Sequence, residues 1–174
     1  MAKGDIKVLR GGGETRSYLV DDRTTSTADV TIKAGEPVVE STNYAAGLRK
    51  TAGPVIATDV FIGIANSEST ETSALNGTVE VITLLESTVL RGKASTAANV
   101  DTAAELLAYL NNNVYFDYSG LTTSLYTIDE DDTDDPNLAA LRIIAGSGDA
   151  AATLDVIVHM NATEHAPLVG QTMD

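Results

Sequence analysis

Hydrophobic and polar residues alternate along several short segments of the chain. This period of two is typical of strands with one face buried. Residues 29–33 and 78–84 alternate in this way, and residues 60–65 form a continuous apolar run that suits a fully buried strand. Most of these segments are rich in Thr, Val and Ile and are separated by Gly, Pro, Asn and Asp. We therefore predict a mainly β fold, a small β-barrel or sandwich.

One segment has the period of a helix instead. Thr102 and Glu105 are spaced for a capping box, in which each side chain bonds the backbone N–H of the other residue. The apolar stripe that follows consists of Ala103, Leu106, Leu107 and Leu110. Asparagines at 111–113 then favour the end of the helix, because Asn tolerates the left-handed conformation found after helices. We predict one α-helix at about 101–111, covering an open end of the sheet.

The last two strands are predicted to form a hairpin. Residues 141–145 and 153–159 are apolar or alternating, and the glycine-containing segment 146–149 supplies the turn. Residues 146–151 also match the G-x-G-x-x-A pattern of dinucleotide-binding folds. That pattern requires a helix next and then a parallel strand. Here an alternating strand follows, so we interpret the glycines as hairpin turn residues.

The first residues differ from the remainder of the chain in charge. Residues 1–20 hold four basic and two acidic side chains, a net charge of +2. Because the whole chain has a net charge of −14, residues 21–174 together carry −16. Glycines 11–13 indicate a flexible break. We predict an extended N-terminal arm at 1–23 and a β-rich domain at 24–174, with a disordered terminus as the alternative for the arm. The predicted partner-contact residues of the arm are Lys3, Lys7, Arg10, Arg16, Tyr18 and Leu19.

Composition narrows the function classes. Aromatic residues make up 5% of the chain, with no Trp and no Cys, so the core must be aliphatic and few rings are present to stack on bases or sugars. A formal charge of −14 opposes binding to nucleic acid. No apolar run approaches the roughly 18 residues of a membrane span. We expect neither nucleic acid nor membrane as a partner.

The acidic run at 129–135 is the one segment with carboxylates spaced like cation ligands. Counted from its first Asp, an EF-hand would need Gly at the sixth position and Glu at the twelfth. Those positions are Asp134 and Ala140, so an EF-hand is excluded. An exposed acidic loop is the favoured interpretation, and a loose cation site is left open.

The two histidines are the remaining candidates for catalysis. His159 ends an alternating strand and His165 lies in an irregular tail. The chain contains no G-x-S-x-G or H-E-x-x-H motif. We therefore interpret both histidines as structural. The prediction is a non-enzymatic protein with no catalytic, metal-binding or cofactor-binding residues, and with no cofactor.

The order of these features resembles the capsid decoration, or cement, proteins of tailed phages, of the β-tulip type. The resembling segments span roughly residues 30–160: 33–39, 60–65, 78–93, the capped helix and the hairpin 141–159. The resemblance implies a homotrimer on the outer capsid surface of a virion, with the major capsid protein as partner. Such a protein would clamp adjacent capsomers and stabilise the mature shell.

Two other function classes remain open from sequence. One is a different β-structural virion protein, such as a tail-tube or fibre-base subunit, which would form rings or filaments. The other is a small β-fold hydrolase or sugar-binding protein, which would need His159 or His165 in a pocket beside a carboxylate or a serine.

Overall fold

The computed structural model describes residues 6–20, 30–40, 47–50, 61–72, 77–118, 126–131 and 141–159. Most of these residues lie in strands, and the α-helix among them is short. The strands are β1 (Lys7–Val20), β2 (Val30–Ile32), β3 (Pro37–Glu40), β4 (Gly47–Lys50), β5 (Phe61–Ala65), β6 (Ser69–Glu71), β7 (Thr78–Lys93), β8 (Asn113–Tyr118), β9 (Tyr126–Asp129), β10 (Leu141–Gly146) and β11 (Thr153–Val158). A 3-10 turn η1 (Ala97–Asn99) and helix α1 (Ala103–Tyr109) separate β7 from β8. The predicted mainly β fold with one helix is confirmed.

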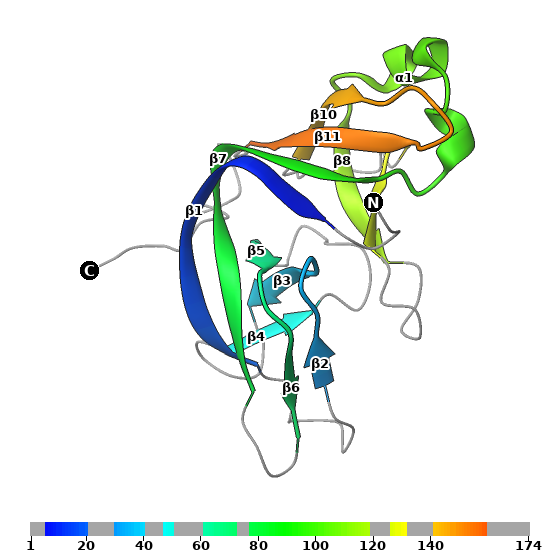
Figure 1. The fold of residues 1–174 in the computed structure, drawn as a ribbon. Coiled ribbons are helices and arrows are strands. Elements are labelled where there is room, and N and C mark those ends of the chain that lie inside the picture. The colour runs from blue at the N-terminus through cyan, green and yellow to red at the C-terminus, as the bar shows by residue number, and fades with distance from the viewer. Residues whose placement is uncertain are drawn as a thin grey trace.

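Two long strands, β1 and β7, run antiparallel and curve together through the whole molecule (Figure 1). At one end they close a ring of five strands in the order β1-β4-β3-β5-β7, back to β1. We call this end the ring lobe. At the other end β7 continues the sheet through β11, β10, β8 and β9. A bridge from Ala94 to Ile128 returns β9 to the end of β7, and we call this end the helix lobe.

Each lobe has its own aliphatic core. The ring-lobe core contains Val20, Ile32, Val38, Ile62, Ala65, Val79 and Val81. The larger helix-lobe core includes Leu84, Leu90, Phe116, Tyr126, Ile128, Ile143, Leu154 and Val156. Strand β11 shows why this sequence forms a strand, since Leu154, Val156 and Val158 are buried while the residues between them are partly exposed.

The two long strands bend where they pass between the lobes. From the Arg10–Val89 pair to the Gly12–Leu84 pair, β1 advances two residues and β7 advances five. The β7 residues between these two pairs, 85–88, form an irregular step with Ser87 at a φ of 69°. Such bulges sharpen strand curvature. They let one sheet turn from the ring into the helix lobe.

The glycines at 11–13 face this step, and the sequence-based prediction of a flexible break there is wrong. A Cβ on Gly13 would lie 2.4 Å from Thr83 Oγ1. The buried hydroxyl of Thr83 donates to the Glu14 carbonyl at 2.9 Å, and that of Thr88 donates to the Gly11 carbonyl at 2.6 Å. The glycines therefore allow a close, hydrogen-bonded crossing of two strands.

The expected arm is likewise part of the body of the protein. Residues 7–20 form β1, which pairs with β7 from Lys7 to Leu19 and with β4 at Leu19 and Val20. The sequence missed this pairing because the partner strand lies about seventy residues away in the chain. The predicted boundary at residue 23 falls outside the described residues.

Helix α1 keeps its predicted cap. The Thr102 side chain accepts from the Glu105 N–H, and Glu105 accepts from the Thr102 N–H at 3.2 Å. Asn111 follows the helix at a φ of 71°, as predicted. The predicted apolar stripe is wrong at Leu107, which is 69% exposed, whereas Leu106 is buried against the β10–β11 hairpin near Gly146.

Candidate protein-binding surface

The predicted arm residues that the structure describes all lie on β1. Lys7 and Arg10 are exposed, and Arg16 forms an ion pair with Glu14 at 3.3 Å. Leu19 is exposed, but Tyr18 packs against the ring-lobe core of its own chain. Lys3 lies outside the described residues. The basic side chains of β1 are thus exposed on a strand that is paired within the sheet. Tyr18, in contrast, helps to cover the core of its own chain.

Among the described strands, β7 alone pairs with residues 7–15 of β1. One side of this segment bonds to β7, and no described strand pairs with its other side. A strand edge presents a row of N–H and C=O groups to which a second chain can add. Bulges and charged side chains discourage unspecific pairing, and β1 has both. This edge therefore favours a partner that offers negative charge.

Further basic residues lie on the outer face of the helix-lobe sheet. Lys7, Arg91 and Asp155 stand in one row across β1, β7 and β11. Lys93 is two residues beyond Arg91, and Arg142 lies opposite Ile157, two residues beyond Asp155. Side chains two apart on a strand share a face. We call the set Lys7, Arg10, Arg91, Lys93 and Arg142 the basic face; it holds five of the eleven Lys and Arg residues of the chain.

Arg91 is fixed in place by Asp155. Its Nε and Nη2 donate to the two carboxylate oxygens at 2.6 and 2.8 Å, the bidentate geometry that orients a guanidinium most firmly. The hydrogen bond and the charge of Asp155 hold the pKa of Arg91 above its usual range. Lys93 Nζ donates to the Ala151 carbonyl. Arg91 and Lys93 thus lie over the sheet in defined positions.

A shallow hollow of about 480 Å³ opens on this face. Its lining combines charged, polar and apolar groups: Lys7, Leu9, Arg91, Gly146, Ser147, Thr153 and Asp155. Leu9 is 44% exposed beside it. The arrangement, an exposed leucine among cations, suits contact with a protein surface that is acidic at its rim and apolar at its centre.

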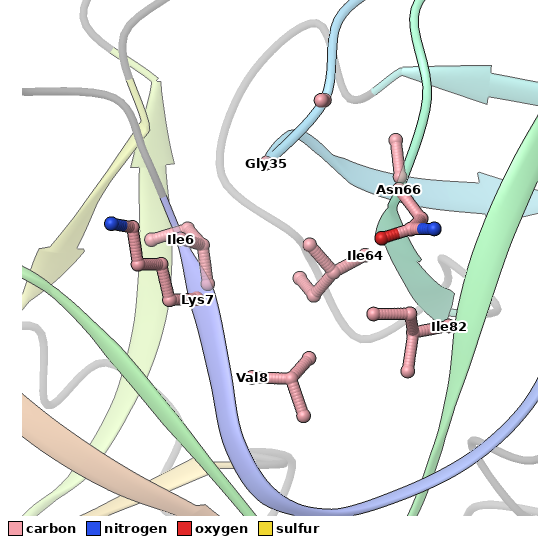
Figure 2. A pocket seen from close by; sticks show the side chains of 9 residues that line it. Ile6, Lys7, Val8, Gly35, Ile64, Asn66 and Ile82 are labelled. Atoms are coloured by element: carbon pink, nitrogen blue, oxygen red, sulfur yellow. The ribbon is translucent and has the colours of Figure 1, made fainter.

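A second groove lies between the lobes and is mostly aliphatic. Figure 2 shows Ile6 and Val8 on the β1 side facing Ile64 and Ile82. Its volume is about 400 Å³, and among the described residues that line it Lys7 alone is ionisable. Ile6 N–H donates to the Gly35 carbonyl at 3.2 Å beside the groove. The groove marks where the two cores approach each other.

The acidic run begins as a structural element, and its prediction as a solvated loop is wrong for its first residues. Asp129 ends β9, and Glu130 is fully buried. Glu130 accepts hydrogen bonds from the N–H groups of Ser95 and Thr96 and from the side chains of Ser95 and Asn99. It thereby anchors η1 to β9. Residues 132–135 lie outside the described part, and the described residues contain no group of three or more His, Asp or Glu that could hold a metal ion.

His159 follows β11 and is partly buried, whereas His165 is outside the described residues. Burial and the charge of Arg142 lower the pKa of His159, while the Leu141 carbonyl and Glu86 oppose that shift. Its Nε2 is buried and has no hydrogen-bond partner in the described part of the chain. Burial and the nearby Arg142 charge thus disfavour the protonated imidazole.

The sequence predicted Lys7 and Arg10 as contact residues, but not Arg91, Lys93, Arg142 or Asp155. The available signal was the two-residue spacing of Arg91 and Lys93, which places both on one face of a strand. Which strands lie beside them is a property of the fold.

Comparison of the chain with family models, with curated proteins and with solved structures finds no match. In the described residues, no helix has the length and apolar character needed to cross a membrane.

Proposed function

We propose that this chain is a non-enzymatic structural protein of a virion, which binds the outer surface of a tailed-phage capsid as a decoration protein. The observation that carries the proposal is the edge of β1 that no described strand covers, with exposed Lys7 and Arg10, on a chain whose net charge is −14. A strand edge is a general-purpose site for protein–protein contact. Its positive charges select an acidic partner surface.

The proposed mechanism is strand addition followed by mass action. An edge strand of the major capsid protein pairs with β1 over residues 7–15, and the basic side chains fix register and orientation. Because the protein would bind the expanded shell and not the unexpanded one, its binding stabilises the expanded state. Several copies, as a homotrimer, would clamp adjacent capsomers. The acidic body is repelled by packaged DNA, which supports the outer face as its location.

The test is co-sedimentation of purified protein with empty shells. The shells are assembled from the major capsid protein encoded nearest to this chain in its genome, both before and after expansion. We expect saturable binding to expanded shells and weaker binding to unexpanded ones. A cryo-electron microscopy map of decorated shells should place β1 against a capsid strand.

Charge variants sharpen this test. Lys7→Glu combined with Arg10→Glu should weaken shell binding about tenfold or more, because like charges brought together at an interface cost several kcal/mol. Lys33→Glu, an exposed site in the turn after β2, is the control and should bind as wild type does. Absence of binding to both shell forms, or a map with β1 remote from the shell, would exclude the proposed function.

A further inference from the structure

Acidic side chains gather on the elements that follow β7. Residues 94–118 and 126–131 form a stretch with six Asp or Glu residues and no Lys or Arg, and of these six Glu130 is fully buried. It includes η1, α1, β8 and β9. These elements make up the end of the helix lobe, and we call them the acidic end. The basic face lies on β1, β7, β10 and β11.

Carboxylates are crowded at the acidic end. Asp101 and Glu105 lie together at the start of α1, and the proximity of Glu105 raises the pKa of Asp101. Asp131 is exposed beside Asn99. The β10–β11 turn abuts the same helix, because a Cβ on Gly148 would lie 3.1 Å from Ala103, and it adds exposed Asp149. Cations brought here would relieve like-charge repulsion.

We propose that the part of the basic face on β7 and β10, which consists of Arg91, Lys93 and Arg142, binds the acidic end of a second copy of this chain, so that copies associate head to tail. Lys7 and Arg10 on β1 remain for the capsid strand. A contact of the basic face with itself would place its cations against one another, at a cost of several kcal/mol. Joining the basic face of one copy to the acidic end of the next is heterologous, and repeating it gives a closed ring or an open filament. A two-fold pair in which each copy contributes both surfaces would stop at two copies and would overturn the head-to-tail order. This head-to-tail contact names the surfaces through which copies of the proposed decoration protein join. Its biological setting rests on the proposed function.

The test uses the purified full chain without shells, so its outcome is independent of capsid binding. Sedimentation velocity over a concentration series measures self-association of wild type at low and high salt. We expect association that weakens as salt rises, since the Debye length falls from about 10 Å at 0.1 M to about 3 Å at 1 M. Electron microscopy then distinguishes rings from filaments.

Charge reversal on each surface tests which residues join. Lys93→Glu with Arg142→Glu on the basic face, or Asp101→Lys with Asp131→Lys at the acidic end, should each weaken association about tenfold or more. Mixing the two double variants should restore association as assemblies in which the two variants alternate, because every contact between unlike copies then pairs opposite charges. Glu68→Lys with Glu80→Lys, exposed on the ring lobe, is the matched control and should associate as wild type does.

A chain that stays monomeric at all concentrations, or association indifferent to salt and to both reversals, would overturn the inference. Circular dichroism of each variant confirms that it is folded. If electron microscopy shows closed rings, both head-to-tail association and a capsid role are supported. If it shows filaments, head-to-tail association is supported, and the function is that of a tail-tube type of subunit. Failure to bind shells removes the proposed function while leaving the measured self-association intact.

Discussion

At the scale of single residues, the bend between the lobes depends on small side chains and two hydroxyls. Gly13 leaves room for Thr83, and Gly11 adopts a φ of 72° against the β7 backbone. Thr83 and Thr88 are buried, and their hydroxyls donate to the Glu14 and Gly11 carbonyls of β1. The irregular register would otherwise leave these carbonyls without a partner on the neighbouring strand. Buried backbone groups need such partners. Each of these residues is therefore expected to be sensitive to substitution.

Gly13→Ala should lower the free energy of unfolding by about 1–3 kcal/mol, the typical cost of overpacking. The new Cβ would meet Thr83 Oγ1 at 2.4 Å, and moving that side chain breaks its bond to the Glu14 carbonyl. Urea unfolding measures the change. Ser17→Ala, exposed on the same strand, is the control and should stay within about 0.5 kcal/mol of wild type. Equal midpoints for both variants would contradict the close crossing.

His159 should make stability depend on pH. Its folded-state pKa is lowered, chiefly by burial. Below the ordinary pKa of about 6.5 the unfolded chain therefore takes up the proton first. The contribution of His159 to stability is complete above pH 6.5 and declines as the pH falls toward the folded-state value. Urea unfolding of wild type and His159→Gln at pH 7.5 and pH 5 measures the difference, and the variant should lose less stability. An equal loss would show that the imidazole is not held neutral.

At the scale of elements, helix α1 offers an internal comparison of two threonine caps. Thr102 caps α1 through its side chain, whereas Thr96 precedes η1 and makes no side-chain cap bond. Thr102→Ala should lower the free energy of unfolding by about 1 kcal/mol, the usual value for a lost N-cap. Thr96→Ala should cost much less. Thermal unfolding followed by circular dichroism compares them, and equal losses would argue against the cap.

Elements with local signals could be predicted from the sequence. The capping box fixed the start of α1, and the β10–β11 hairpin follows from two apolar segments around glycines. Strand β1 could not be predicted, because its stabilising contacts come from β7 and β4. Glycines at 11–13 suggest flexibility in isolation. They form a strand only because Thr83 and Thr88 supply hydrogen bonds from a distant segment.

The candidate surface was partly predictable for the same reason. Net charge singled out Lys7 and Arg10 near the N-terminus. Arg91 and Arg142 were not found, since only the order β1-β7-β11-β10 brings them beside those residues. Asp155, which orients Arg91, is sixty-four positions away in the chain. Strand order therefore decides which charges form one surface.

At the scale of the whole molecule, the two lobes share their longest strands. Val79 and Val81 of β7 belong to the ring-lobe core, while Leu84 and Leu90 of the same strand belong to the helix-lobe core. Ile64 of β5 extends the coupling, because it lies in the ring of strands yet packs with the helix-lobe core. The lobes are therefore expected to unfold as one cooperative unit.

A core substitution in one lobe should accordingly destabilise both. Leu154→Ala removes a fully buried side chain from the helix-lobe core and should cost about 2–5 kcal/mol. Native-state hydrogen exchange should show amides of β5 losing as much protection as amides of β11, because global unfolding exposes both. Leu107→Ala, at an exposed site, should leave both unchanged. If β5 kept its protection in Leu154→Ala while β11 lost it, the lobes would be independent, and the bend at β1 and β7 would be a joint between two separately stable units.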